Sequence, residues 1–196
     1  MEFNIVVYGC DNSGKTTLAR NLVTHLMEKA NGKPIDFAYI HSLGPVETGK
    51  QLDFMYRETR KVDGNIVRVF DRFPLIEERV CGMAIRGRDV FYNDHTTRAR
   101  MLGRIDLFIH CDPGIETVLN WGNREQMDGV KENAKEMYMG YKRIPYEFPE
   151  CHLENRILCY NFHDDPFGES LAKKVWPMVS SAYNNVTAFK KNGGIT

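Results

Sequence analysis

Short apolar runs, rich in β-branched residues, recur along the chain between longer segments in which apolar residues return every three or four positions. The first pattern is typical of buried strands and the second of amphipathic helices. The predicted strands span residues 3–8, 35–41, 65–70, 105–111 and 156–162. Strands that alternate with helices form a parallel sheet covered on both faces, so the pattern predicts a three-layer α/β fold.

The helical segments between these strands begin and end at recognisable signals. They are predicted over residues 18–30, 48–61, 74–84, 115–121, 130–144 and 167–183, with a loop and a short helix within 86–104. Pro145 is expected to end the helix that precedes it, because proline lacks the amide proton and crowds the preceding turn. Residues 184–196 are polar and are expected to fray. A single domain over residues 1–183 with a polar C-terminal tail is therefore predicted.

Composition narrows the range of partners. The 26 basic and 26 acidic residues cancel, so a small-molecule ligand is expected rather than nucleic acid. No apolar run has the length of a membrane span and no signal peptide is apparent, so no membrane partner is expected. The five cysteines are odd in number and favour reduced thiols in a cytoplasmic protein over a disulfide framework.

The chemistry begins with a glycine-rich stretch, GCDNSGKTT, at residues 9–17, between the first predicted strand and the first predicted helix. It matches G-x-x-x-x-G-K-[ST], in which backbone amides and a helix N-terminus surround phosphate oxygens. Lys15 is suited to the β- and γ-phosphates and Thr16 to Mg²⁺. The predicted nucleotide-binding residues are Asn12, Ser13, Gly14, Lys15, Thr16 and Thr17. The alternative is a chance match in an ordinary strand-to-helix turn.

Other polar residues follow the ends of predicted strands, where parallel sheets bind ligands. The phosphate loop is expected to share this rim with His41, Asp71, Arg72 and Asp112. Asp71 is placed to hold Mg²⁺, directly or through water, and Arg72 to bind a second phosphate group with two parallel hydrogen bonds. Alternatively, Asp71 caps the following helix and Arg72 pairs with Glu77 or Glu78.

Three motifs together resemble thymidylate kinases and, more broadly, P-loop nucleoside monophosphate kinases, including those of bacterial viruses. They are Gly9-Cys10-Asp11, Asp71-Arg72-Phe73, and Ile105-Asp106-Leu107 leading to Cys111-Asp112-Pro113. The resemblance implies a three-layer P-loop kinase fold with a five-stranded parallel sheet in the order 2-3-1-4-5. It also implies an ATP site, a monophosphate-acceptor site, a lid around residues 120–131 and, as a habit of the family, a homodimer.

The resemblance also suggests roles for individual residues. Asp11 would contact the acceptor sugar and Arg72 the acceptor phosphate. Asn12 stands where some thymidylate kinases carry an arginine, so another residue must supply positive charge to the transferred group. Relatives without the loop arginine use lid arginines, which assigns this part to Arg124. Lysines follow it at helical spacing and either add positive potential or form a solvated face: Lys131, Lys135 and Lys142.

The acceptor base is less well defined. Phe54 and Arg57 resemble, in type and order, the aromatic residue and the arginine that stack on and read the base in this family. Equally, they fit a core phenylalanine and a surface arginine. Ile76 stands where the family often has a serine near the base. Thymine is thus a first choice.

The sequence therefore predicts an ATP- and Mg²⁺-dependent kinase that phosphorylates a deoxynucleoside monophosphate, with dTMP as the first choice. Lys15 and Arg124 would stabilise charge on the transferred group. One alternative, a deoxynucleoside kinase, would carry a glutamate where this chain has His41 and Ser42. Others are a kinase acting on a nucleotide within DNA or RNA, suggested by the arginines of residues 86–104, and a P-loop regulatory NTPase.

Overall fold

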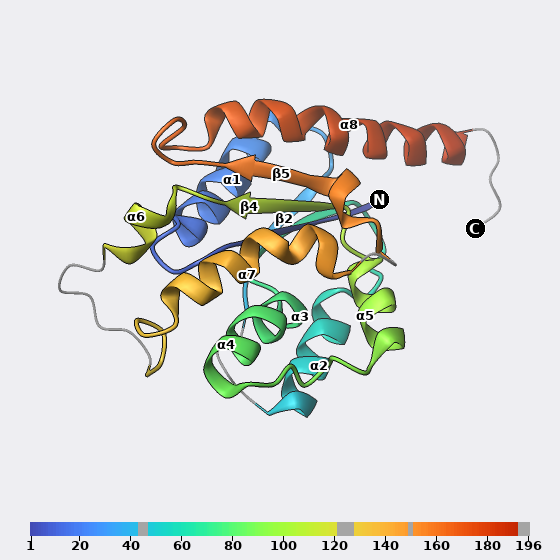
Figure 1. Cartoon of the computed structure of the whole chain (residues 1–196). Coiled ribbons are helices and arrows are strands. Elements are labelled where there is room, and N and C mark those ends of the chain that lie inside the picture. Colours follow the sequence, from blue (N-terminus) through green and yellow to red (C-terminus); the bar gives the residue numbers. More distant parts are fainter. Residues whose placement is uncertain (43–46, 121–127, 149–150, 192–196) are drawn as a thin grey trace.

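The computed structural model describes residues 1–42, 47–120, 128–148 and 151–191 (Figure 1). Within them lies one parallel sheet with the strand order β2-β3-β1-β4-β5. The strands are β1 (Glu2–Tyr8), β2 (Asp36–His41), β3 (Ile66–Asp71), β4 (Leu107–Cys111) and β5 (Ile157–Tyr160). The predicted three-layer α/β fold and its strand order are confirmed.

The central strands β1, β3 and β4 are mostly apolar because both faces of the sheet are covered. In β1, Ile5 and Val7 belong to one apolar cluster while Val6 and Tyr8 belong to the other, and all four are fully buried. This alternation is the period of two that a strand imposes on its side chains. The two clusters are the two halves of the core, one on each face of the sheet.

A different set of helices covers each face of the sheet (Figure 1). The first face packs against α1 (Lys15–Ala30) and α8 (Glu169–Lys191), whose buried leucines and valines complete one cluster. The second face carries α2 (Thr48–Glu58), α3 (Pro74–Glu77), α4 (Met83–Arg86), α5 (His95–Leu102) and α7 (Ala134–Glu147). A π-helical turn, η1 (Glu78–Gly82), joins α3 to α4. The short α6 (Ile115–Leu119) follows β4, and a 3₁₀ turn, η3 (Leu153–Arg156), precedes β5.

At two helix ends, a sequence feature that was expected to stop the helix does not do so. Pro145 does not end its helix, because it lies in the last turn of α7, which continues to Glu147. Helix α8 does not fray after Tyr183 but continues to Lys191. Residues 184–191 contain neither glycine nor proline, and the Thr187 hydroxyl donates to the Tyr183 carbonyl at 2.9 Å within the helix. Polarity alone was thus a poor guide to where the helix ends.

Within residues 86–104, a turn-rich segment comes first and α5 follows it, as predicted. The Asp94 carboxylate caps this helix by accepting the Thr97 amide at 2.9 Å. No helix in the described part of the chain combines the length and apolarity that crossing a bilayer requires.

Candidate functional site

The register of the sheet brings three strand ends together. Asp71, the last residue of β3, lies opposite Val7 of β1 on one side and His41 of β2 on the other. The glycine-rich loop leaves β1 two residues after Val7 and enters α1 at Lys15. The loop, His41 and Asp71 therefore share the rim at the carboxyl ends of the strands, as the sequence predicted.

The loop needs its two glycines for different reasons. Gly9 has φ 142°, and a Cβ there would lie 2.5 Å from the Cys111 carbonyl oxygen. Gly14 has φ 81°, and a Cβ there would touch the Phe162 ring at 3.0 Å. Only glycine adopts these conformations without strain. The result is a narrow loop of backbone amides at the N-terminus of a 16-residue helix, an arrangement that binds phosphate.

Lys15 lies inside this loop. Its side chain is buried, and Nζ donates to the Cys10 carbonyl at 2.5 Å and lies 3.5 Å from Asp11 Oδ1. A buried ammonium needs such partners, because burial otherwise disfavours its charge. The lysine thus holds positive charge within the loop that would surround the phosphates.

Asp71 is the most heavily used acceptor on the rim. Its carboxylate is fully buried, and Oδ2 accepts the Thr16 hydroxyl at 2.7 Å and the Tyr39 hydroxyl at 2.9 Å. His41 Nδ1 lies 3.0 Å from the same oxygen. The other oxygen, Oδ1, is buried and has no hydrogen-bond partner among the described residues. The carboxylate therefore retains capacity for a further electropositive ligand.

This donor set suits Mg²⁺. A hydroxyl and a carboxylate are hard oxygen ligands, and Mg²⁺ is usually held by one or two such groups together with water and phosphate. Among the described residues no group of three or more His, Cys, Asp and Glu side chains converges, so the site lacks the donors of an all-protein cage. Thr16 and Asp71, the residues predicted from sequence, are the ones that would hold the ion.

Arg72 directly follows Asp71 and contacts two carboxylates. Nη2 donates to Asp11 Oδ1 at 2.5 Å, and Nη1 lies 3.6 Å from Glu77 Oε2. The arginine has φ 75°, a left-handed backbone conformation that is strained for residues other than glycine. Residues with such strained conformations cluster at functional sites. Its amide donates to the Val7 carbonyl at 3.0 Å, which fixes the turn. The alternative interpretation, in which Arg72 pairs with Glu77, is confirmed, while binding of a second phosphate group by Arg72 stays a prediction.

The pKa values of the two carboxylates beside Arg72 are shifted in opposite directions. Burial opposes ionisation of Asp11, but Lys15 and Arg72 outweigh it and lower the pKa of Asp11. Burial dominates at Glu77 and raises its pKa despite the nearby Arg72 and Lys15. Burial also disfavours the charge of Arg72, but Glu77 and Asp11 outweigh it and raise the pKa of the guanidinium. Asp11 and Arg72 are therefore held as ions, and Glu77 is the group closest to neutrality.

Other predicted residues are less closely connected to this centre. Ser13 is buried, Thr17 is exposed on α1, and Asn12 donates to the Asn120 carbonyl at 3.4 Å. Phe54 is 4 % exposed within the core, and exposed Arg57 donates to the neighbouring Glu58 at 2.7 Å. No described hydrogen bond or ion pair links Phe54 or Arg57 to Asp11 or Arg72. Arg124 lies outside the described residues.

Sequence reasoning missed one contributor to this centre and one pairing outside it. Tyr39 alternates with His41 on β2, so a period of two could have placed both on the same face beside Asp71. Gln51 of α2 donates to Glu78 at 2.9 Å, and Arg86 donates to the same carboxylate at 2.6 Å. No local signal indicates this second pairing, because it depends on how η1 packs against α2. It lines a cavity of about 480 Å³ between these elements.

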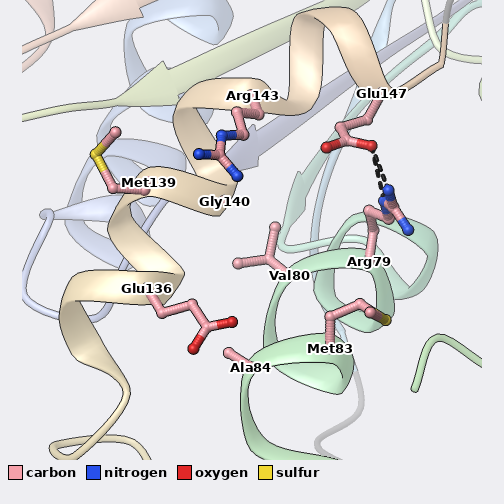
Figure 2. Close-up of a pocket in the computed structure, with 9 residues that line it drawn as sticks. All are labelled: Arg79, Val80, Met83, Ala84, Glu136, Met139, Gly140, Arg143 and Glu147. Carbon is pink, nitrogen blue, oxygen red and sulfur yellow. Dashed lines mark hydrogen bonds and ion pairs between the residues drawn. The ribbon is translucent and has the colours of Figure 1, made fainter. Parts of the chain in front are cut away.

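A second cavity of about 270 Å³ lies between η1 and α4 on one side and α7 on the other (Figure 2). Arg79 of η1 and Glu147 of α7 pair at one end of the cavity (Figure 2). Glu136 and Arg143 also line it from α7. Its lining shares no residue with the centre around Asp11 and Arg72. The phosphate loop and its neighbours, rather than this cavity, form the candidate site.

The fold and the rim define a three-layer α/β protein with a glycine-rich loop at the carboxyl edge of its parallel sheet. Neither a protein-family model nor a curated protein sequence matches the chain. Among solved structures, the YorR protein of Bacillus subtilis, in complex with phosphorylated GDP, is similar with a TM-score of 0.62 and 12 % sequence identity. The match covers 92 % of this chain and 98 % of YorR. At this identity the similarity shows the fold.

Proposed function

We propose that this protein is a nucleoside monophosphate kinase that transfers the γ-phosphoryl group of ATP to a deoxynucleoside monophosphate, with dTMP as the first choice. One observation carries the proposal: Lys15 and Arg72, from different elements, both contact Asp11 Oδ1, at 3.5 and 2.5 Å. A cation in the phosphate loop thus adjoins a cation outside it. A kinase that joins two phosphate groups needs this pair of neighbouring anion sites.

Each residue has a distinct part in the proposed reaction. The amides of residues 9–15 and Lys15 bind the donor phosphates. Arg72 binds the acceptor phosphate, and Asp11 lies between the two cations and offsets their repulsion. Thr16 and Asp71 would hold Mg²⁺, which when bound neutralises charge on the β- and γ-phosphates. Arg124, which lies outside the described residues, is proposed to add positive charge at the transferred group.

An acceptor phosphate is already ionised at neutral pH, so the reaction requires no general base. This supports a monophosphate acceptor over a nucleoside, whose neutral hydroxyl would have to be deprotonated. At the end of β2, where a base would be expected for a nucleoside, His41 is engaged with Asp71 at 3.0 Å. The same reasoning weighs against an acceptor hydroxyl at the end of a nucleic acid.

The acceptor base is open to direct measurement. The enzyme is incubated with ATP, Mg²⁺ and a panel of dTMP, dGMP, GMP, the matching nucleosides and 5′-hydroxyl oligonucleotides, and the products are identified by mass. The guanine compounds belong in the panel because YorR was solved with a phosphorylated guanine nucleotide. Phosphorylation of a deoxynucleoside monophosphate supports the proposal. Phosphorylation of nucleosides or oligonucleotides alone, or ATP hydrolysis without any phosphorylated acceptor, overturns it.

A further inference from the structure

Arg72 is bracketed by carboxylates on the side where the acceptor phosphate would bind. Nη2 donates to Asp11 at 2.5 Å and Nη1 faces Glu77 at 3.6 Å. These two terminal nitrogens are the donors with which arginine binds a phosphate by two parallel hydrogen bonds. The carboxylates therefore compete with phosphate oxygens for the same donors. The role of Glu77 in this competition rests on the proposed function, in which that phosphate belongs to the acceptor.

The net charge of the cluster adds to this competition between the carboxylates and the phosphate. Two cations, Lys15 and Arg72, are balanced by two acids, Asp11 and Glu77, so the fully ionised cluster has no net charge. A phosphate monoester adds close to two negative charges at neutral pH, beside those of the donor. Like charges at such short separations disfavour one another strongly when partly buried. One of the two carboxylates must lose its charge for the acceptor to bind well.

The surroundings show which carboxylate is suited to do so. Asp11 lies between two cations, which stabilise its charge. Glu77 has one oxygen, Oε1, that is buried without a hydrogen-bond partner among the described residues, while Oε2 accepts the Tyr141 hydroxyl at 3.0 Å. The groups that face Glu77 are Arg72 after β3, Cys10, Asp11 and Lys15 of the loop, Cys81 of η1 and Tyr141 of α7.

Two acids whose environments push their pKa values apart commonly have two different roles. Here the pKa of Glu77 is raised by burial, while the neighbouring cations lower that of Asp11. Binding of a dianion next to Glu77 would raise its pKa further, because a like charge disfavours the carboxylate. Geometry, charge balance and titration thus single out the same residue.

We propose that Glu77 is a substrate-binding residue of the acceptor site that takes up one proton from solvent when a nucleoside monophosphate binds to Arg72. The proton adds to the carboxylate, and no other bond forms or breaks. The neutral acid releases Arg72 to the phosphate and no longer repels it. A neutral nucleoside brings no such charge and draws no proton. Proton uptake by Glu77 therefore accompanies only the binding of an acceptor that carries a phosphate group.

The test is isothermal titration calorimetry of dTMP, or of dGMP if that is the monophosphate phosphorylated in the panel, in two buffers with different ionisation enthalpies. The free phosphate is a dianion above pH 7, since its second pKa is about 6. We expect uptake approaching one proton per bound monophosphate. The Kd should rise with pH by up to about tenfold per unit while Glu77 is ionised in the free enzyme and protonated in the complex.

Glu77→Gln identifies the group that takes the proton. Glutamine has the size of the neutral acid and cannot titrate, so uptake should vanish and the Kd at pH 8.5 should fall by about tenfold. Glu136→Gln is the matched control, because Glu136 is an exposed acid on α7 outside the site (Figure 2). It should leave both quantities unchanged. Proton uptake that persists in Glu77→Gln would assign the proton to a group other than Glu77 and overturn the inference.

Tyr141→Phe provides a second variant should Glu77→Gln fail to fold. Loss of the Tyr141 hydroxyl removes a hydrogen bond that favours the ionised form, so more Glu77 is already protonated in the free enzyme. The uptake on binding at pH 7.5 should therefore decrease. An unchanged uptake in Tyr141→Phe, or none in the wild type, contradicts the role of Glu77.

The two proposals fail in different ways. A monophosphate that is phosphorylated but binds without proton uptake overturns the role of Glu77 and leaves the kinase proposal intact. Phosphorylation of nucleosides or oligonucleotides alone overturns the monophosphate kinase, and the role of Glu77 with it.

Discussion

Lys15 and Arg72 approach each other through a single atom, Asp11 Oδ1, which lies 3.5 Å from the lysine Nζ and 2.5 Å from the arginine Nη2. The lysine enters the site from the start of α1 and the arginine from the end of β3. Because the two cations come from separate elements, each can bind its own phosphate while the carboxylate between them limits their repulsion. Donor and acceptor functions can therefore be removed one at a time.

Lys15→Ala should remove the donor function. Loss of a buried cation aimed at developing charge should lower kcat by about 100- to 1,000-fold. The measurement is steady-state turnover with saturating ATP and the acceptor found in the panel. Lys29→Ala, in the last turn of the same helix, is the control and should retain wild-type turnover. Substantial activity in Lys15→Ala would place the donor phosphates elsewhere.

Arg72→Ala should act mainly on the acceptor. Removing a charge-assisted pair of hydrogen bonds costs about 1.5 to 3 kcal/mol, so the acceptor KM should rise by tenfold or more. The KM for ATP should change far less. Arg143→Ala, an exposed arginine on α7 (Figure 2), controls for the loss of a surface cation. An acceptor KM and kcat that both stay at the wild-type values would contradict the assignment of Arg72.

Gly9→Ala should disrupt the loop through a backbone clash. Its Cβ would lie 2.5 Å from the Cys111 carbonyl oxygen, so β1 and β4 would have to shift apart. We expect a loss of about 1 to 3 kcal/mol in the free energy of unfolding, measured in urea, together with weaker ATP binding. Gly64→Ala is the matched control: Gly64 also has positive φ, at 122°, but a Cβ there meets nothing within 4 Å. Equal losses in both variants would show that strain alone, without the clash, accounts for the effect.

Much of this architecture follows from local patterns. The apolar runs predicted all five strands because both faces of a parallel sheet are buried. The loop sequence predicted that Lys15 and Thr16 follow the glycine-rich turn, and the end of the third predicted strand placed Asp71 on the same rim. The sequence could not supply the contacts made by packing. The pairing of Arg72 with Glu77 was one of the sequence-based alternatives, but no local pattern places the Tyr141 hydroxyl of α7 on Glu77. The π turn after α3 is likewise marked by no local signal. The ends of α7 and α8 were predicted wrongly for a simpler reason. A proline in the last turn of a helix and a polar helical segment both have the sequence pattern of a loop.

His110 predicts a dependence of stability on pH. It is buried in β4 with its ring stacked on Tyr8 at 4.9 Å, and burial lowers its pKa from 6.5 to about 4. The unfolded chain therefore binds a proton that the folded chain does not, between pH 6.5 and about 4. Stability from His110 is complete above pH 6.5 and is lost as the pH falls towards 4, by about 3 kcal/mol in total. Urea unfolding of the wild type and His110→Phe across this range should show a shallower acid loss in the variant. Parallel curves would contradict it.

The last prediction concerns how Asp71 is held. The Tyr39 hydroxyl donates at 2.9 Å to the oxygen that also accepts Thr16, and this leaves the other oxygen of Asp71 with capacity for a ligand. A group that orients a metal-binding carboxylate commonly changes metal affinity by about 10- to 100-fold.

Tyr39→Phe should therefore raise the Mg²⁺ concentration needed for half-maximal activity by about tenfold while leaving kcat at saturating Mg²⁺ nearly unchanged. Direct titration of Mg²⁺ into the ADP complex should show the same shift, which separates metal binding from turnover. Tyr146→Phe is the control, because Tyr146 is 78 % exposed on α7. If Tyr39→Phe alters kcat but not the Mg²⁺ dependence, the hydroxyl acts elsewhere in the reaction and Asp71 is oriented by Thr16 and His41 without it.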